Sequence, residues 1–261
     1  MNKNGASDYE PSRVTMTLKG YKEAVKSQNG RDVIWTTDIN TELPIRMPLT
    51  GVGAEIAPIT FSQIFKRVQY QRGHNSALKV QRNGRDLTWS WLDFWRDAVA
   101  FSKSMEAIGV EPRKSVNICG FNSPEWAISF FGGILHNNVS SGVYQTNTPE
   151  VRVYQALNSE AQVIVVDNLE QLKIYHSILD QLPEVKAVVA WLVDKIPQEY
   201  ADDKRIHTWN DFLKLGKDVK DEVTDAIMEA QRPGMCCCLI YTSGTTGNPK
   251  GVMLSHDNLI Y

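Results

Sequence analysis

The residues best suited to chemistry lie in one eleven-residue stretch, YTSGTTGNPKG, from Tyr241 to Gly251. It contains three glycines, four Ser or Thr hydroxyls and one lysine. Glycines let neighbouring backbone N–H groups turn toward a common point and approach a phosphate closely. Hydroxyls add short hydrogen-bond donors, and the lysine adds a mobile positive charge. The composition therefore predicts a loop that holds a polyphosphate.

Two common phosphate-binding patterns do not fit this sequence. A Walker A loop needs G-x-x-x-x-G-K-[ST], but Pro249 precedes Lys250 and Gly251 follows it. A dinucleotide fingerprint G-x-G-x-x-G would start at Gly51, but its third glycine position is occupied by Ile56. The remaining alternative is a flexible surface turn, which is disfavoured because ordinary turns rarely use so long a run of such residues after a buried-looking strand.

The loop and several upstream segments resemble a known family. YTSGTTGNPKG followed by VMLSHDNL is similar to the phosphate loop of the adenylate-forming (AMP-binding) superfamily, which includes acyl-CoA synthetases, luciferases and peptide-synthetase adenylation domains. Within it, the bubblegum-type long-chain acyl-CoA synthetases are resembled by GFNSPEW (120–126), GVYQTNTPE (142–150), LPEVKAVV (182–189) and CCCLIYTSGTTGNPKGVML (236–254). The resemblance runs from about Trp35, beside the segment IWTTD, to Tyr261.

This resemblance implies an ATP-dependent long-chain fatty acid–CoA ligase. In that family the fatty acid carboxylate attacks the α-phosphorus of ATP, giving acyl-adenylate and pyrophosphate, and the coenzyme A thiolate then displaces AMP. Charge on the pyrophosphate is neutralised by loop donors, lysine and Mg²⁺. The implied phosphate-binding residues are Thr242, Ser243, Gly244, Thr245, Thr246, Gly247, Asn248, Pro249 and Lys250.

Other parts of the family's machinery follow the loop: the adenine-binding segment, a magnesium-binding glutamate, a ribose-binding aspartate and the catalytic lysine of a mobile C-terminal domain. We therefore assign no catalytic residue and no metal ligand within these 261 residues, and expect the chain alone to form no acyl-adenylate. His256 is interpreted as a capping or packing residue. Two alternatives stay open: a shortened non-catalytic isoform that acts through binding, and the adenylation domain of a peptide synthetase.

Composition limits the partners. A net charge of −2 provides no basic field for nucleic acid. The longest strongly apolar run, Trp126–Leu135, has about half of the roughly 20 residues that a membrane-spanning helix needs, and no apolar signal segment is visible in residues 1–30. We expect a cytoplasmic protein without a transmembrane segment. Its lipid substrate leaves open peripheral contact with the endoplasmic reticulum membrane.

Three adjacent cysteines, Cys236 to Cys238, precede the loop. Neighbouring side chains in a strand point to opposite faces, so these thiols are poorly placed to share a zinc ion or to pair with each other. We interpret them as small buried hydrophobic residues of a strand, with free thiols in a reducing compartment.

The elements that position the loop alternate between strand and helix. A hairpin is expected around Asn83-Gly84, and Ser123-Pro124 and Thr148-Pro149 are typical helix starts. The predicted strands are 115–121, 139–144, 162–166, 185–193 and 235–241, and the predicted helices 91–108, 124–136, 149–159, 169–182, 210–215 and 221–231, with a further helix capped by Ser255. This alternation predicts an α/β fold: a three-layer parallel sheet with flanking helices.

The resemblance implies that this fold is one part of a larger enzyme. Residues 1–34 are predicted to be a poorly ordered extension. Residues 35–261 are predicted to be the N-terminal portion of an AMP-binding domain, truncated after the phosphate loop. Such an incomplete domain would expose a sheet edge and apolar faces, so we expect the isolated chain to be poorly stable or prone to aggregation. The loop itself is expected between a strand and a helix, at the carboxyl edge of the sheet.

Overall fold

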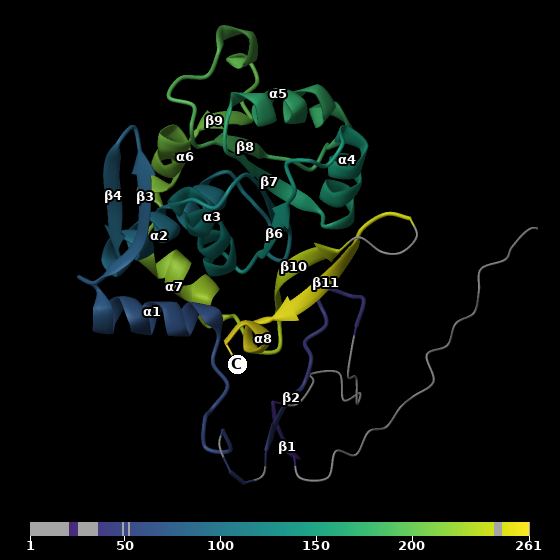
Figure 1. Cartoon of the computed structure of the whole chain (residues 1–261). Helices are drawn as coiled ribbons and strands as arrows, with labels where there is room; N and C mark the ends of the chain where they lie inside the picture. Colours follow the sequence, from purple (N-terminus) through teal and green to yellow (C-terminus); the bar gives the residue numbers. More distant parts are fainter. Residues whose placement is uncertain (1–20, 26–35, 49, 52, 243–246, 261) are drawn as a thin grey trace, which may run out of the picture.

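A seven-stranded sheet forms the centre of the molecule (Figure 1). The computed structural model describes residues 21–25, 36–48, 50–51, 53–242 and 247–260. The strand order is β11-β10-β6-β5-β7-β8-β9. The strands are β5 (Ser115–Cys119), β6 (Val139–Val143), β7 (Ala161–Val166), β8 (Ala187–Ala190), β9 (Ile206–Thr208), β10 (Cys236–Thr242) and β11 (Lys250–Ser255). From β10 to β9 each neighbouring pair is parallel, whereas β11 is antiparallel to β10.

Helices cover both faces of this sheet, which confirms the predicted three-layer α/β architecture. The helices are α1 (Phe61–Arg72), α2 (Trp91–Ala107), α3 (Pro124–Leu135), α4 (Pro149–Asn158), α5 (Leu169–Ile178), α6 (Trp209–Leu215), α7 (Asp221–Glu229) and α8 (His256–Ile260). Residues of α2, α3 and α6 form one apolar core with Val116 and Val163, and residues of α4 and α5 form another with Ile164 and Val166. The central strands are thus covered on both sides, as is usual for a parallel sheet with helices on both faces.

Local sequence signals set several element boundaries. The hairpin of β3 (Ser76–Arg82) and β4 (Arg85–Ser90) turns at Asn83 and Gly84, which have φ angles of 51° and 73°. Both positive angles are typical of the tight hairpin turn that the Asn-Gly pair predicts. At the start of α3, the Ser123 side chain accepts a hydrogen bond from Trp126 N. At the start of α4, the Thr148 side chain makes no such bond, although Pro149 occupies the first turn as predicted.

Two strands differ from the sequence prediction. β9 lies where we predicted no strand, and its three residues are too few to produce a recognisable alternation. β11 occupies residues 250–255, where the loop was expected to lead directly into a helix. The predicted helix does begin at His256, but only after the chain has crossed back along β10. The loop is therefore the connection of an antiparallel hairpin, which corrects the strand–loop–helix prediction.

The three adjacent cysteines are buried in β10 and have free thiols, as predicted. Their side chains do not alternate strictly between the faces of the sheet, because the β10–β11 register shifts between Cys236 and Cys238. Cys236 packs with Val139 and Leu239, whereas Cys237 and Cys238 belong to the same apolar cluster. A bulge of this kind places two successive residues against one on the partner strand, and no sequence signal marked it here.

The N-terminal region contributes a second, two-stranded sheet. In it β1 (Tyr21–Val25) pairs antiparallel with β2 (Ile45–Pro48). The boundary at residue 34, between the predicted extension and the predicted AMP-binding domain, stays a prediction.

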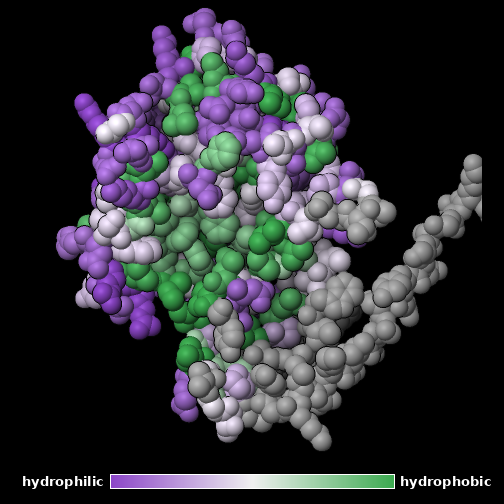
Figure 2. Space-filling model, viewed as in Figure 1, coloured by the Kyte–Doolittle hydropathy of each residue, from purple (hydrophilic) through white to green (hydrophobic). Residues whose placement is uncertain are grey.

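On the surface, apolar side chains gather over α3 and toward β10 (Figure 2). No helix in the described part of the chain combines the length and hydrophobicity needed to cross a bilayer.

Candidate phosphate-binding site

The predicted phosphate loop leaves the sheet at the carboxyl end of β10. Thr242 pairs with Lys250, and Tyr241 pairs with Gly251, so these two pairs close the loop. Because β10 runs parallel to β6, the loop emerges at the same edge as the connections that follow the parallel strands. In open α/β sheets, ligands bind at this carboxyl edge. The position of the loop thus agrees with the edge expected from the sequence.

The structure describes five of the nine predicted site residues. Ser243, Gly244, Thr245 and Thr246 lie outside the described residues. Thr242, Gly247, Asn248 and Lys250 are exposed, and Pro249 is half-buried. Gly247 has a φ of 85°, a left-handed conformation that favours glycine.

The described loop residues have the donor chemistry that a polyphosphate requires. Thr242 offers a hydroxyl, Asn248 an amide and Lys250 an ammonium group, all open to solvent. The surface at Gly247 is open, since an added Cβ there would meet no heavy atom of the described residues within 4 Å. None of the nine residues is a carboxylate, so the loop suits an anion. A magnesium ion at this place would be held mainly through the phosphates.

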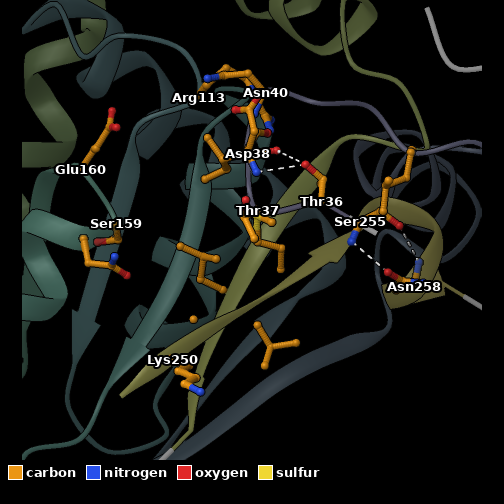
Figure 3. A pocket seen from close by; sticks show the side chains of 18 of the residues that line it. Thr36, Thr37, Asp38, Asn40, Arg113, Ser159, Glu160, Lys250, Ser255 and Asn258 are labelled. Carbon is orange, nitrogen blue, oxygen red and sulfur yellow. Dashed lines mark hydrogen bonds between the residues drawn. The ribbon is translucent and has the colours of Figure 1, made fainter. Parts of the chain in front are cut away.

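A polar cleft lies beside Lys250. It has a volume of about 870 Å³, and Figure 3 shows Lys250 at one end of it and Asp38, Asn40 and Arg113 at the other. Asp38 Oδ1 accepts a hydrogen bond from Asn40 N at 2.9 Å, which with other hydrogen bonds holds the pKa of Asp38 below its usual range. The cleft therefore joins the base of the loop to the segment formed by residues 36–45.

Arg113 fixes this segment against the sheet. Its guanidinium donates one hydrogen bond to Cys236 O at 2.8 Å and another to Ile39 O at 2.6 Å. Burial lowers the pKa of Arg113, although the side chain still lines the cleft. Sequence reasoning missed this residue because a lone arginine in a turn resembles any solvated charge. Its φ of 70°, which is unusual for arginine, is visible only in the structure.

His256 has the packing role predicted for it. It is 1% exposed, and its Nδ1 accepts a hydrogen bond from Phe61 N at 3.1 Å. Burial, with a smaller contribution from Arg113, lowers the pKa of His256 to about 4. The ring therefore joins α8 to the start of α1 as a neutral group.

The cysteines of β10 are poor candidates for redox or metal chemistry. Burial raises the pKa of Cys238 to about 12 and also raises that of Cys236 and Cys237, so the thiols stay protonated near neutral pH. Metal binding and nucleophilic attack both need the thiolate. Among the residues described by the structure, no cluster of three or more His, Cys, Asp or Glu side chains could hold a metal ion.

Comparison with known proteins points to one family. Residues 65–261 match the family model described as AMP-binding enzyme. The chain is 37% identical over 231 residues to the long-chain-fatty-acid–CoA ligase ACSBG2 of Xenopus laevis, covering 87% of this chain and 30% of that protein. It is also 37% identical over 230 residues to ACSBG1 of Rattus norvegicus, covering 88% and 31%. The chain thus spans about a third of the length of these relatives.

Solved structures show the same fold. The anthranilate CoA ligase AuaEII, in complex with anthranoyl-AMP, matches with a TM-score of 0.61 and 23% identity over 76% of this chain and 35% of that chain. The adenylation domain of a carboxylate reductase from Mycobacterium chelonae matches with a TM-score of 0.63 and 19% identity over 77% and 35%.

Proposed function

This chain belongs to the family of AMP-binding enzymes, and from that premise we propose that it is the N-terminal part of an ATP-dependent long-chain fatty acid–CoA ligase. The proposed overall reaction converts fatty acid, ATP and CoA to acyl-CoA, AMP and diphosphate. Similarity to the two ACSBG ligases supports this substrate class. The observation that carries the proposal is the hairpin loop of residues 242–250, which opens at the carboxyl edge of a parallel sheet with Lys250 exposed at its base.

In the proposed role, the loop binds the β- and γ-phosphates of ATP. The hydroxyl of Thr242 and those of Ser243, Thr245 and Thr246 donate hydrogen bonds to phosphate oxygens, and Lys250 supplies positive charge. These contacts favour adenylation because negative charge grows on the departing pyrophosphate as the carboxylate attacks the α-phosphorus. Mg²⁺, when bound to the phosphates, neutralises further charge.

Several finer assignments belong to the same proposal. Coenzyme A is proposed as the second acceptor of the acyl group. We also propose a cytoplasmic location, with peripheral contact at the endoplasmic reticulum membrane where the fatty acid is drawn from lipid. The alternative of a non-catalytic protein that binds ATP without activating a carboxylate predicts the same nucleotide affinity. The two differ in the chemical step only for the whole ligase, because the 261-residue chain alone is expected to form no acyl-adenylate in either case.

The role of the loop is tested by titrating the 261-residue chain with Mg·ATP in a calorimeter. The Lys250→Ala variant is expected to bind about tenfold more weakly, because a charge-assisted contact to phosphate is worth on the order of 1.5 kcal/mol or more. Lys79→Ala is the control, since Lys79 forms an exposed ion pair with Asp86 in β4 and lies on a different sheet. Equal affinity of the unmodified chain and Lys250→Ala would contradict the proposed role of the loop.

The chemical step is tested separately with ATP–pyrophosphate exchange. We expect the 261-residue chain to show no exchange with palmitate, because the family's adenine, ribose and magnesium groups have no counterpart among the residues assigned here. Measurable palmitate-dependent exchange by the purified chain would overturn this expectation and would place the catalytic groups within residues 1–261.

A further inference from the structure

One side chain links β10, the strand that leads into the loop, to helix α4. Tyr241 is the penultimate residue of β10 and is 6% exposed. Its hydroxyl donates a hydrogen bond to Asn158 Oδ1 at 2.7 Å. Asn158 is the last residue of α4, so the bond links positions that are 83 residues apart in the sequence. It lies one residue from Thr242, where the proposed phosphate site begins.

The same ring supports the strand that leaves the loop. Gly251 is the direct partner of Tyr241 in the hairpin. A Cβ added to Gly251 would lie 3.1 Å from Tyr241 Cζ and 3.4 Å from its hydroxyl oxygen, so the ring lies close against the glycine backbone. The glycine that ends the loop motif therefore makes room for the tyrosine. Tyr241, itself a residue of β10, therefore contacts α4 through Asn158 and β11 through Gly251.

Buried polar contacts hold the residues of α4 near Asn158. Arg152 in α4 is 1% exposed and donates hydrogen bonds to Asn147 O at 3.0 Å and Gln145 O at 2.7 Å. Ser159, which directly follows Asn158, accepts a hydrogen bond from Ser115 Oγ in β5 at 2.8 Å. Breaking such buried bonds costs the desolvation of each group left unpaired. The backbone around Asn158 is thus held by its neighbours, whereas its own side chain is exposed and lines the cleft beside Lys250.

We propose that Tyr241 is a positioning residue for the phosphate loop. Its ring and hydroxyl hold Thr242 and Lys250 in one fixed arrangement relative to the sheet. This inference rests on the proposed role of the loop in binding the triphosphate. Tyr241 does not need to touch the nucleotide, because it acts through the backbone of the two strands. Preorganised donors bind and stabilise charge better than donors that must first be ordered.

The hydrogen bond from Tyr241 to Asn158 is not expected to titrate in the physiological pH range. Burial raises the pKa of the Tyr241 phenol to about 12, so the hydroxyl keeps its proton and remains a donor. The hydrogen bond to Asn158 is consequently expected to act in the same way at every pH at which the protein is folded and active.

The test is a double-mutant cycle measured by Mg·ATP titration. Tyr241→Phe keeps the ring and removes the donor, and Asn158→Leu removes the acceptor. Each is expected to raise the Kd for Mg·ATP about fivefold, the change that corresponds to one neutral hydrogen bond of about 1 kcal/mol. The double variant is expected to bind no more weakly than either single variant, because both remove the same bond. Asn158→Gln keeps a neutral amide acceptor and should retain most of the affinity.

Tyr175→Phe is the matched control. Tyr175 is fully buried in α5, its hydroxyl has no hydrogen-bond partner among the described residues, and it belongs to a different apolar cluster from Tyr241. Its removal should leave the Kd for Mg·ATP unchanged. All titrations are made at a temperature well below the thermal unfolding midpoint of each variant, so that a loss of affinity reports on the loop and not on the fraction of folded protein.

The outcomes separate the two proposals. Unchanged affinity in Tyr241→Phe, or additive losses in the double variant, would overturn the positioning role while leaving the proposed function in place. If the unmodified chain itself showed no saturable binding of Mg·ATP, the proposed function would fall and the positioning role with it. A coupled loss in Tyr241→Phe and Asn158→Leu, with most of the affinity kept in Asn158→Gln, would support the positioning role.

Discussion

Lys250 and His256 lie six residues apart and show how environment decides what a basic residue can do. Lys250 is exposed at the base of the loop, where its charge is available to an anion. His256 is buried, with its Nδ1 accepting a hydrogen bond from the backbone of α1. Removal from water disfavours the charged form of the imidazole. One residue is therefore suited to ligand binding, whereas the other stabilises the fold only while it is neutral.

The buried histidine predicts a pH-dependent stability. Its pKa is about 4 in the folded chain against 6.5 for an ordinary histidine. Since the unfolded state takes up a proton between these values and the folded state does not, stability is fully present above pH 6.5 and falls as the pH drops toward 4. The slope should approach 1.4 kcal/mol per pH unit within this window. Urea unfolding of the unmodified chain and His256→Gln at several pH values measures it, and equal slopes in the two proteins would contradict the assignment.

At the scale of elements, α3 and α4 begin with the same sequence pattern but with different contacts. Both have a hydroxyl residue followed by proline and glutamate, and both helices were predicted from that pattern. Only Ser123 uses its side chain as a cap, with Trp126 N as the donor. The pattern was sufficient to predict the helices because it restricts the backbone. It could not predict the cap, which depends on the rotamer and neighbours of one hydroxyl.

This difference predicts unequal costs for two similar substitutions. Ser123→Ala removes a capping hydrogen bond and should lower the free energy of unfolding by about 1 kcal/mol. Thr148→Ala, at the corresponding position of α4, removes no such bond and should lower it by less than about 0.5 kcal/mol. Chemical denaturation of the two variants measures the costs. A Thr148→Ala cost as large as that of Ser123→Ala would contradict the capping assignment.

For the whole molecule, the sequence was enough to predict the three layers and the position of the loop, but not every strand of the sheet: β9 and β11 were not predicted. Short segments rich in valine and isoleucine, such as β7, alternate with helices whose ends are marked by caps, prolines and glycines, so the α/β architecture followed from local rules. β9 and β11 each pair with the strand before them in the chain, but β9 has only three residues and β11 follows a loop that was expected to lead into a helix. Arg113 and Tyr241 were missed for a different reason: their importance comes from partners 74 and 83 residues away.

The edge strand β11 predicts self-association of the 261-residue chain. Its Val252 is 47% exposed and faces Ile240, 49% exposed, across the hairpin, so apolar side chains line an outer edge of the sheet. Val252→Lys places a charge on this edge and should reduce association. Light scattering coupled to size-exclusion chromatography measures it, with the exposed Val223→Lys in α7 as control. A monodisperse unmodified chain would contradict the expectation.

The central claim is that the loop of residues 242–250 binds the triphosphate tail of ATP. Its most direct test compares the affinities of Mg·ATP, Mg·ADP and AMP for the 261-residue chain in one set of calorimetric titrations. The loop is assigned to the β- and γ-phosphates, so Mg·ATP should bind most tightly, Mg·ADP more weakly and AMP at least tenfold more weakly than Mg·ATP. Inorganic triphosphate with Mg²⁺ should compete with ATP. Equal binding of AMP and Mg·ATP, or no competition by triphosphate, would contradict the account.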